Sequence, residues 1–390
     1  MTQPSHIRCK NMILGALVAD AAAMGLHWIY DQDHIAKVAP DAPEFKDPDP
    51  RNFDGVPAYY AHPTKTSGEL SQYGEQVMVM LRTLAKDGGE FCAADFADQF
   101  RAHFGYGGAY VGYIDHATRG TLDNYRSFED AVNACALDVP FEGDQRIRKA
   151  LVAKLLPLLH RHSGADLTEA FRLAVRETST DEATIEFGAR LLDAMNTVPL
   201  ATGTTDVQLP AIAKLPALIA RLCIQGDTSG AAFSEPVAAA IRTTSDNPTA
   251  TVFGMAGAKM MAAAVLHGNS DAVIKAARSI ADPAVNKLIE QAIEMQGKDN
   301  ATATKHFGMA CDMPFGIPSA AHNIATATSF SDAIRRNIYG GGDSCGRAIL
   351  VGAVMGAIFG VGGDQGIPQA WIDRLDVKDD AGALIEKLVS

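Results

Sequence analysis

Apolar residues recur at intervals of three and four along almost the whole chain, and this spacing limits the possible fold more than any other feature. In an α-helix these intervals place side chains on one face, whereas a β-strand needs apolar residues at alternate positions. Residues 14–18 and 77–84 are clear examples, and alternating β-branched runs are scarce. We therefore predict an all-α protein. Further helices are expected at residues 91–103, 144–162, 165–177, 181–195, 211–224, 233–242 and 249–267.

The chain shows no repeat and no low-complexity linker, so we predict one large helical domain over residues 1–390. Residues 40–57 and 306–318 are rich in Pro, Gly or Asp, and we expect long surface loops there. Gly352, Gly356 and Gly360 are spaced four apart, so they would share a helix face that a neighbouring helix can approach closely. We expect that helix to be central.

Charge and cysteine content narrow the classes of function. The chain has 34 basic and 46 acidic residues and a net charge of −12, which repels nucleic-acid phosphates and anionic lipid. We predict neither a nucleic-acid nor a membrane partner. The six cysteines lie far apart without a Cys-x-x-Cys pair, which favours reduced thiols and a cytoplasmic location.

The apolar run 12–19 has some features of a secretory signal, but Asp20 interrupts it, and we predict that it is retained.

The most informative segment is 339–347, Tyr-Gly-Gly-Gly-Asp-Ser-Cys-Gly-Arg, which leads into the most apolar stretch of the chain. Asp343 is placed to cap that helix, and the glycines before it would leave the first amide groups open to an anion. An ordinary capped helix explains Asp343 equally well. It does not explain the three glycines, nor Cys345 and Arg347 on the first turn of a buried helix.

Three further segments place polar residues next to apolar helices. Glu75 follows the polar opening 68–74, Asp246 lies in the turn 243–248, and Asp20 lies within the first apolar run. On a continuous helix, Asp20 and His27 would share a face two turns apart. Helix-dipole stabilisation of Glu75 and a simple N-cap at 243–248 are the plain alternatives. Taken together, these segments predict polar groups that converge on one cleft.

These segments resemble the ADP-ribosylglycohydrolases, all-α enzymes that remove ADP-ribose from proteins and small acceptors at a two-magnesium site. The resemblance spans most of the chain and is most specific at residues 331–360, followed by Pro368 and Trp371. Residues 25–31 and 68–76 are similar to the branch of the J-type lens crystallins and their bacterial relatives. The resemblance implies a single orthogonal helical domain of the family type.

The sequence departs from the family where metal ligands are expected. Positions 73–76 read Tyr-Gly-Glu-Gln where the family has Thr-Asp-Asp-Thr, and Cys345 and Gly346 replace a second Asp-Thr pair. His27 stands where the resemblance implies a glutamate near the scissile bond. Magnesium prefers several hard oxygen ligands, so at most one ion is expected, held by the ligand set Glu75, Asp343 and Asp246.

A fixed cation could replace a lost ion. Arg347 lies one turn after Asp343, which would place its guanidinium beside the vacated ligands and make it available to a phosphate or carboxylate. A purely structural Asp343–Arg347 pair is equally open. Cys345 could act as a nucleophile, although a small buried apolar role is more usual for such a residue.

We therefore predict a hydrolase that cleaves an N- or O-glycosidic bond at the anomeric carbon of an ADP-ribosyl or related ribosyl ligand, small or protein-linked. Glu75 and Asp343 would stabilise the oxocarbenium-like state, and His27 would act as acid or base. The alternative is a non-catalytic, crystallin-like or ligand-binding descendant. The oligomeric state is left open. The residues predicted to bind substrate are Asp20, Trp28, Tyr73, Gln76, Asp246, Gly341, Gly342, Ser344, Cys345 and Arg347.

Overall fold

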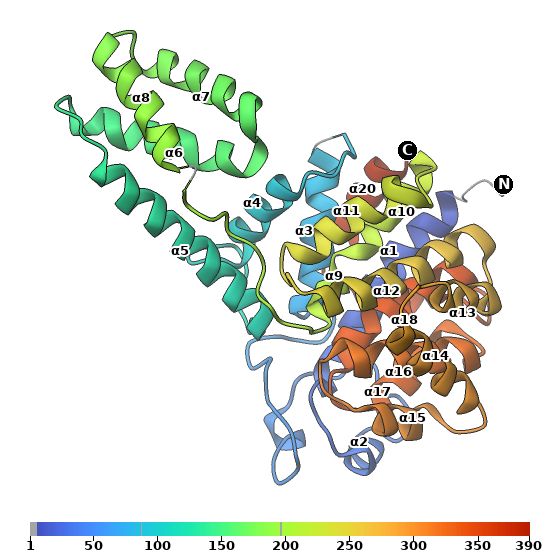
Figure 1. Ribbon diagram of the computed structural model, residues 1–390. Coiled ribbons are helices and arrows are strands. Elements are labelled where there is room, and N and C mark those ends of the chain that lie inside the picture. The colour runs from blue at the N-terminus through green and yellow to red at the C-terminus, as the bar shows by residue number, and fades with distance from the viewer. Residues whose placement is uncertain (1–5, 87, 196) are drawn as a thin grey trace. The chain divides into compact units, whose positions relative to one another are not determined.

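The computed structural model describes residues 6–86, 88–195 and 197–390, and within them the regular structure is helical (Figure 1). These residues form isolated β-bridges, such as Ile29 with Ala58, but no sheet. The all-α prediction is confirmed.

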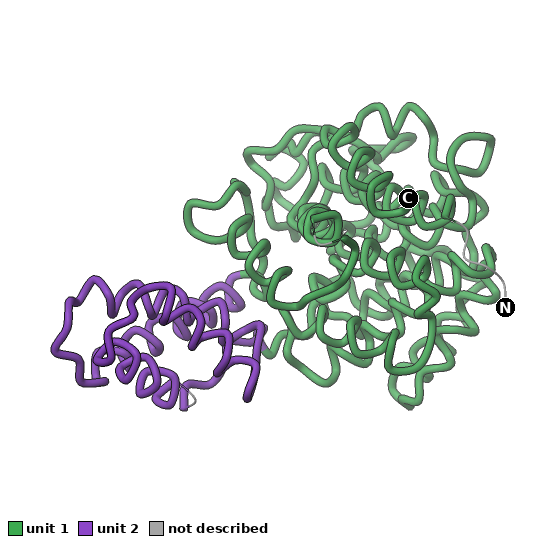
Figure 2. The backbone as a smooth tube through the Cα atoms, turned by 90° about the horizontal axis from the view of Figure 1, so that it is seen from above, with its two compact units in different colours: residues 1–118, 205–390 green, residues 119–204 purple. Residues whose placement is uncertain are grey.

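The chain forms two compact units, coloured separately in Figure 2. Unit 1 comprises residues 1–118 and 205–390, and unit 2 comprises residues 119–204. Compact units defined by their internal contacts can belong to one domain. One domain over residues 1–390 therefore stays a prediction.

The first part of unit 1 contains α1 (His6–Ala23), η1 (Met24–Leu26), α2 (Gln32–Val38), η2 (Pro50–Asn52), α3 (Gln72–Lys86) and α4 (Ala93–Phe104). Helix α5 (His116–Asp138) begins in unit 1, and unit 2 contains α6 (Gln145–Arg161), α7 (Gly164–Thr178) and α8 (Glu182–Met195). The rest of unit 1 contains α9 (Pro210–Ala213), α10 (Leu215–Gln225), α11 (Gly230–Arg242), α12 (Pro248–His267), α13 (Ser270–Arg278), α14 (Pro283–Glu294), α15 (Asn300–Phe307), α16 (Met313–Thr326), α17 (Phe330–Tyr339), α18 (Ser344–Phe359), α19 (Gln369–Ile372) and α20 (Lys378–Val389).

Two apolar helices, α1 and α18, form the centre of unit 1 and pack against each other along their length (Figure 1). Glycines make this approach possible. A Cβ on Gly15 would lie 2.3 Å from the carbonyl oxygen of Gly352, and one on Gly356 would lie 2.3 Å from that of Asn11. The predicted close approach at the glycine face is therefore confirmed, with Gly360 as the residue that ends α18.

Among the described residues, two helical stretches are long and apolar enough to span a membrane, His6–Leu26 and Pro248–His267. Their most apolar windows are 83% and 67% buried inside the protein, respectively. A core helix has the same composition as a membrane span, and burial in the core is sufficient to explain these two.

Unit 2 has a hydrophobic core of its own. It is built from one face of each of its helices, including Phe128, Leu155, Phe171 and Leu191. The polar outer faces of α7 and α8 give these helices the amphipathic pattern that made them predictable from sequence.

Most predicted helix bounds agree with the structure within a few residues, and two predictions were wrong. Residues 211–224 form two helices instead of one, because Pro216 has no N–H to continue the first. Residues 306–318 are mostly helical. Pro314 lies in the first turn of α16, where a missing N–H has no cost, and Pro318 is accommodated inside the same helix.

Candidate functional site

Asp343 lies at the centre of the predicted site and caps α18. Its Oδ1 accepts a 2.9 Å hydrogen bond from the amide of Gly346, as the sequence predicted for an N-cap. Gly341 and Gly342 precede it with φ angles of +68° and +60°, which residues with a Cβ rarely adopt. A Cβ on Gly342 would lie 2.0 Å from the carbonyl oxygen of Met309, so this turn requires glycine.

The glycine turn is tied to the segment that follows α1. The amide of Trp28 donates to the carbonyl of Gly342 at 2.8 Å, and the amide of Gly342 donates to the carbonyl of Ile29 at 2.7 Å. Trp28 has a φ of +65°, and these backbone bonds hold it in that uncommon conformation. The structure thus brings together two of the segments that the sequence singled out.

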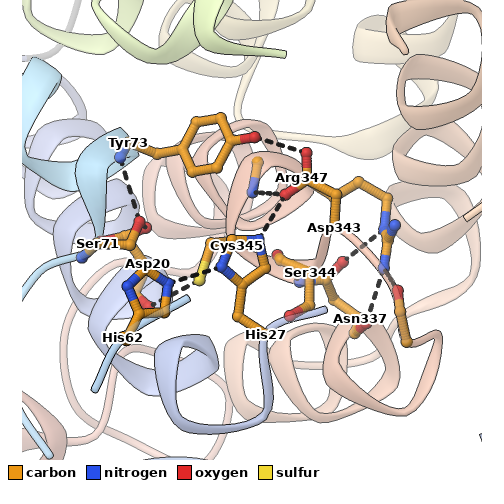
Figure 3. Close-up of polar contacts among 12 residues, drawn as sticks. Asp20, His27, His62, Ser71, Tyr73, Asn337, Asp343, Ser344, Cys345 and Arg347 are labelled. Atoms are coloured by element: carbon orange, nitrogen blue, oxygen red, sulfur yellow. Dashed lines mark hydrogen bonds and ion pairs between the residues drawn. The ribbon is translucent and has the colours of Figure 1, made fainter. Parts of the chain in front are cut away.

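Two side chains form hydrogen bonds with the carboxylate of Asp343, one with each oxygen (Figure 3). The hydroxyl of Tyr73 donates to Oδ2 at 2.7 Å, and Nε2 of His27 lies 2.9 Å from Oδ1. All three side chains are completely buried. Both carboxylate oxygens are therefore bound by the protein itself.

His27 continues this network to a residue that the sequence did not single out. Its Nδ1 lies 2.9 Å from Nε2 of His62, and the two rings are stacked. The expectation that His27 shares a helix face with Asp20 was wrong, because α1 ends at Ala23 and His27 has extended backbone. His62 comes from an irregular segment between α2 and α3, and no periodicity or motif marks it.

Asp20 binds the beginning of α3. Its carboxylate accepts hydrogen bonds from the amide of Ser71 at 2.8 Å and from the hydroxyl of the same residue. A Cβ on Gly74 would lie 2.3 Å from Oδ2 of Asp20, so this carboxylate fills the space that a side chain at position 74 would need. The Sγ of Cys345 contacts the carbonyl of Asp20 at 3.8 Å from the other side.

Burial and hydrogen bonding set the ionisation of these groups. Burial raises the pKa of Asp20 to about 7. Burial alone would raise the pKa of Asp343 as well, but the hydrogen bonds and charge of His27 and the bond from Tyr73 hold it below its usual value. Burial, followed by the nearby charges of Asp20 and Asp343, raises the pKa of Cys345 well above the usual thiol value. A buried neutral thiol is a poor nucleophile.

Arg347 is hydrogen-bonded to Asn337 and Gly341 and not to Asp343. Its Nε donates to Oδ1 of Asn337 at 3.1 Å, and Nη2 donates to the carbonyl oxygens of Asn337 and Gly341 (Figure 3). It forms no ion pair with Asp343 in the part of the chain that the structure describes. Burial lowers the pKa of Arg347 to about 10, which leaves the guanidinium charged at neutral pH. The predicted direct pair of Asp343 and Arg347 was wrong, because the guanidinium is bonded to Asn337 and to the glycine turn. Its Nη1 is buried without a hydrogen-bond partner among the described residues, and the predicted contact with an anionic ligand stays a prediction.

Glu75 and Asp246 are not bonded to Asp343. Oε2 of Glu75 lies 2.9 Å from Nε2 of His103, and Oε1 lies 3.7 Å from Nζ of Lys65. Asp246 forms no hydrogen bond or ion pair with any residue in the described ranges. Its neighbour Asn247 is the residue that caps α12, with the amide of Thr249 as donor.

Gln76 and Ser344 are also buried, and Oε1 of Gln76 and Oγ of Ser344 have no hydrogen-bond partner within the described part of the chain. Nε2 of Gln76 lies 3.4 Å from the hydroxyl of Thr118, and the carbonyl of Ser344 accepts a 2.8 Å bond from Asn337. Trp28 is stacked on His27 with a centroid distance of 4.3 Å and is only 6% exposed.

A protein-family model described as ADP-ribosylglycohydrolase matches residues 1–390. The chain belongs to the ADP-ribosylglycohydrolase family.

Individual relatives agree with this membership. Crystallin J1A of Tripedalia cystophora is 25% identical over 370 residues, which cover 94% of this chain and 91% of that protein. Crystallin J1B of the same organism is 23% identical over 370 residues, which again cover 94% of this chain and 91% of that protein. A solved ADP-ribosylglycohydrolase-related protein complex shares the fold, with a TM-score of 0.58 and 17% identity over 98% of this chain and 97% of that one. The predicted resemblance to the family and to its J-type crystallins is confirmed.

The ADP-ribosylglycohydrolase resemblance implies magnesium, and the residues present do not fit such an ion. Asp343 has both oxygens bound by protein donors, and Glu75 is engaged by His103 and Lys65. In the described ranges, no group of three or more His, Cys, Asp or Glu side chains is arranged to hold a metal. Magnesium needs several oxygen ligands around one point, and these side chains do not supply them. The single-ion expectation stays a prediction.

Proposed function

We propose that this chain keeps the ADP-ribosylglycohydrolase fold in a structural or ligand-binding role and does not hydrolyse ADP-ribosyl bonds. The observation that carries this proposal is the bonding of Asp343. Both oxygens of its buried carboxylate accept hydrogen bonds from Tyr73 and His27 or from the helix that it caps. Three of the roughly four acceptor positions of this carboxylate are used by protein donors, so a metal ion would have to displace Tyr73, His27 or the capping bond to gain more than one contact with it.

The residues around Asp343 support the same proposal. Tyr73 fills the position where the family resemblance implies a small threonine, and the carboxylate of Asp20 fills the space beside Gly74. Cys345 is a neutral buried thiol in place of another ligand. Tyr73 and Cys345 are completely buried, as is Asp20, and buried side chains of this kind contribute to the stability of the fold.

Binding without hydrolysis has its own support in an aromatic surface next to the buried network. Trp28 is in edge contact with Tyr59 at 5.7 Å and with Tyr113 at 5.0 Å between ring centroids. Tyr59 is 55% exposed, so this group offers ring faces to the solvent. Such faces can stack on the planar base of an ADP-ribosyl or related ribosyl ligand, which is the ligand class that we propose.

A second candidate is hydrolysis without a metal, and the chain of His62, His27 and Asp343 is the observation that favours it. A carboxylate orients its histidine and stabilises the protonated ring, and a second histidine can pass the proton on. His27 would then give its proton to the leaving group as the glycosidic bond breaks, while Asp343 stabilises the oxocarbenium-like state. A water molecule would add to the anomeric carbon, and its proton would return to the histidine pair. This mechanism requires that the segment carrying His62 opens to admit the ligand, because His27 is completely buried.

One experiment separates the two candidates. Purified protein is incubated with ADP-ribosylated arginine and serine peptides, with magnesium or with EDTA, and released ADP-ribose is quantified beside an active family member. Calorimetric titration with ADP-ribose measures binding in the same preparations. We expect binding without release in either buffer. Release that persists in EDTA and is lost in His27→Ala would instead establish metal-free hydrolysis, and release that requires magnesium would overturn both candidates.

A further inference from the structure

A concave region of unit 1 lies between α11, α12 and α13, and Asp343 is not among the residues that line it. It is a cavity of about 510 Å³, within the size range of small-molecule sites. One face of α12 forms a wall of this cavity, because residues 255, 259, 262, 263 and 266 recur at helical spacing. The network around Tyr73 and His27 contributes no residue to it.

The floor of this cavity is apolar. Phe233 of α11 and Ala262 and Ala263 of α12 lie there and are buried, and Met255 and Leu266 extend the apolar lining. The two alanines leave room that larger side chains on a core helix would fill. An occupant with a hydrocarbon or aromatic body would remove this surface from water.

The polar lining of the cavity has one sign of charge. Lys259 and His267 contribute the basic groups, and no Asp or Glu is among the described residues that line it. The hydroxyl group of Ser234 lies in the same lining and can donate a hydrogen bond, whereas that of Ser279 already donates to the carbonyl of Ala276.

Lys259 has no carboxylate partner to neutralise it. Its Nζ lies 3.3 Å from the hydroxyl of Ser279, and no described residue forms an ion pair with it. A half-buried ammonium group that is bonded to one hydroxyl retains donors for an anion. The contrast with α17 is informative, since Arg336 there is paired with Asp332 at 2.7 Å.

We propose that this cavity binds a small amphipathic anion, with its carboxylate or phosphate group on Lys259 and its apolar body on the floor formed by Phe233, Ala262 and Ala263. The proposal is independent of the role of Asp343. A ligand bound here contacts α11, α12 and α13 together and therefore stabilises their packing.

The test is calorimetric titration of the full chain with decanoate and, separately, with octyl phosphate, which distinguishes the two head groups. The wild-type protein is expected to bind at least one of them. Lys259→Gln should weaken this binding at least tenfold, and Lys259→Glu should abolish it by charge repulsion. Ala263→Phe should abolish it by filling the floor. Lys275→Gln is the matched control, since Lys275 is exposed on α13 and does not line the cavity.

Far-UV circular dichroism and melting curves establish that each variant is folded, and the Lys259 variants test the proposal even if Ala263→Phe does not fold. The proposal is overturned if the wild-type protein binds neither compound at millimolar concentration. It is also overturned if the Lys259 variants bind as well as the wild type, because the occupant would then be recognised by its apolar body alone.

Discussion

The hydroxyl of Tyr73 lies 2.7 Å from Oδ2 of Asp343, so a side chain at the beginning of α3 directly bonds the residue that caps α18. These residues are 270 positions apart in the sequence. The family resemblance implies a metal ligand at each of the two positions, and here the two side chains bind one another. The bond therefore joins two segments of the fold that an ion would otherwise bridge.

Replacement of Tyr73 by phenylalanine should destabilise the protein without changing its shape. The change removes only the hydroxyl and leaves a buried carboxylate oxygen without its donor, which costs about 1–3 kcal/mol. Urea unfolding at pH 7 measures the loss. Tyr106→Phe is the control, because that side chain is fully exposed and should unfold as the wild type does. Equal stability of Tyr73→Phe and wild type would show that the bond has no structural role.

Introducing a side chain at position 74 should destabilise the protein, because the carboxylate of Asp20 occupies the space that this side chain would need. Gly74→Ala is expected to lower the melting temperature, since its Cβ would lie 2.3 Å from Oδ2 of Asp20. The double variant Gly74→Ala with Asp20→Ser should lose less free energy of unfolding than the two single variants lose together, because the obstructing carboxylate is absent. Gly382→Ala in α20 is the control, because nothing lies within 4 Å of its added Cβ. Strict additivity would contradict the proposed conflict between the two residues.

Asp20 should make the stability of the protein depend on pH between about 4 and 7. Its pKa is about 7 in the folded protein against a usual value of 3.8, so the folded state holds a proton that the unfolded chain releases over this range. The free energy of unfolding from this group therefore falls as pH rises from 4 to 7 and is level above 7. Burial also raises the pKa of Asp115, to about 6. The free energy of unfolding from Asp115 therefore also falls as the pH rises.

Comparison of Asp20→Asn with the wild type isolates this contribution. The variant should gain stability relative to the wild type as pH is raised from 4.5 to 7.5, as measured by urea unfolding at each pH. A difference between the two proteins that stays constant over this range would mean that Asp20 is ionised throughout.

Arg347 should contribute to stability and not to ligand binding. Its guanidinium holds Asn337 and the carbonyl of Gly341 together, and a lysine cannot reproduce this forked geometry. Arg347→Lys is expected to lose about 2 kcal/mol or more of stability while the affinity for ADP-ribose is unchanged. Arg336→Lys, with a half-exposed guanidinium, is the matched control. Weaker ADP-ribose binding at unchanged melting temperature would return Arg347 to the ligand site.

The sequence was a good guide to the helices, because helix formation depends on local spacing. Amphipathic spacing located α7 and α8, and the glycines at 352 and 356 located the central packing. The interactions that decide the chemistry are long-range. Tyr73 and His27 were identified as candidates, but their bonds to Asp343 depend on how three segments meet.

Other contacts left no trace in the local pattern. His62 lies in an irregular segment, and Asn337 on α17 looks like an ordinary polar residue. Arg347 is four residues after Asp343, which suggested a helical ion pair. The N-cap conformation of Asp343 directs its carboxylate back to the amide of Gly346, and the guanidinium turns to the glycine loop instead.

The central claim is that Asp343 is bound by Tyr73 and His27 and is not available to a metal ion. A crystal structure of the protein grown with ADP-ribose and magnesium tests it most directly. The account predicts the hydroxyl of Tyr73 and Nε2 of His27 within hydrogen-bond distance of Asp343, with no ion between them. An ion coordinated by Asp343, with Tyr73 displaced from the carboxylate, would contradict it.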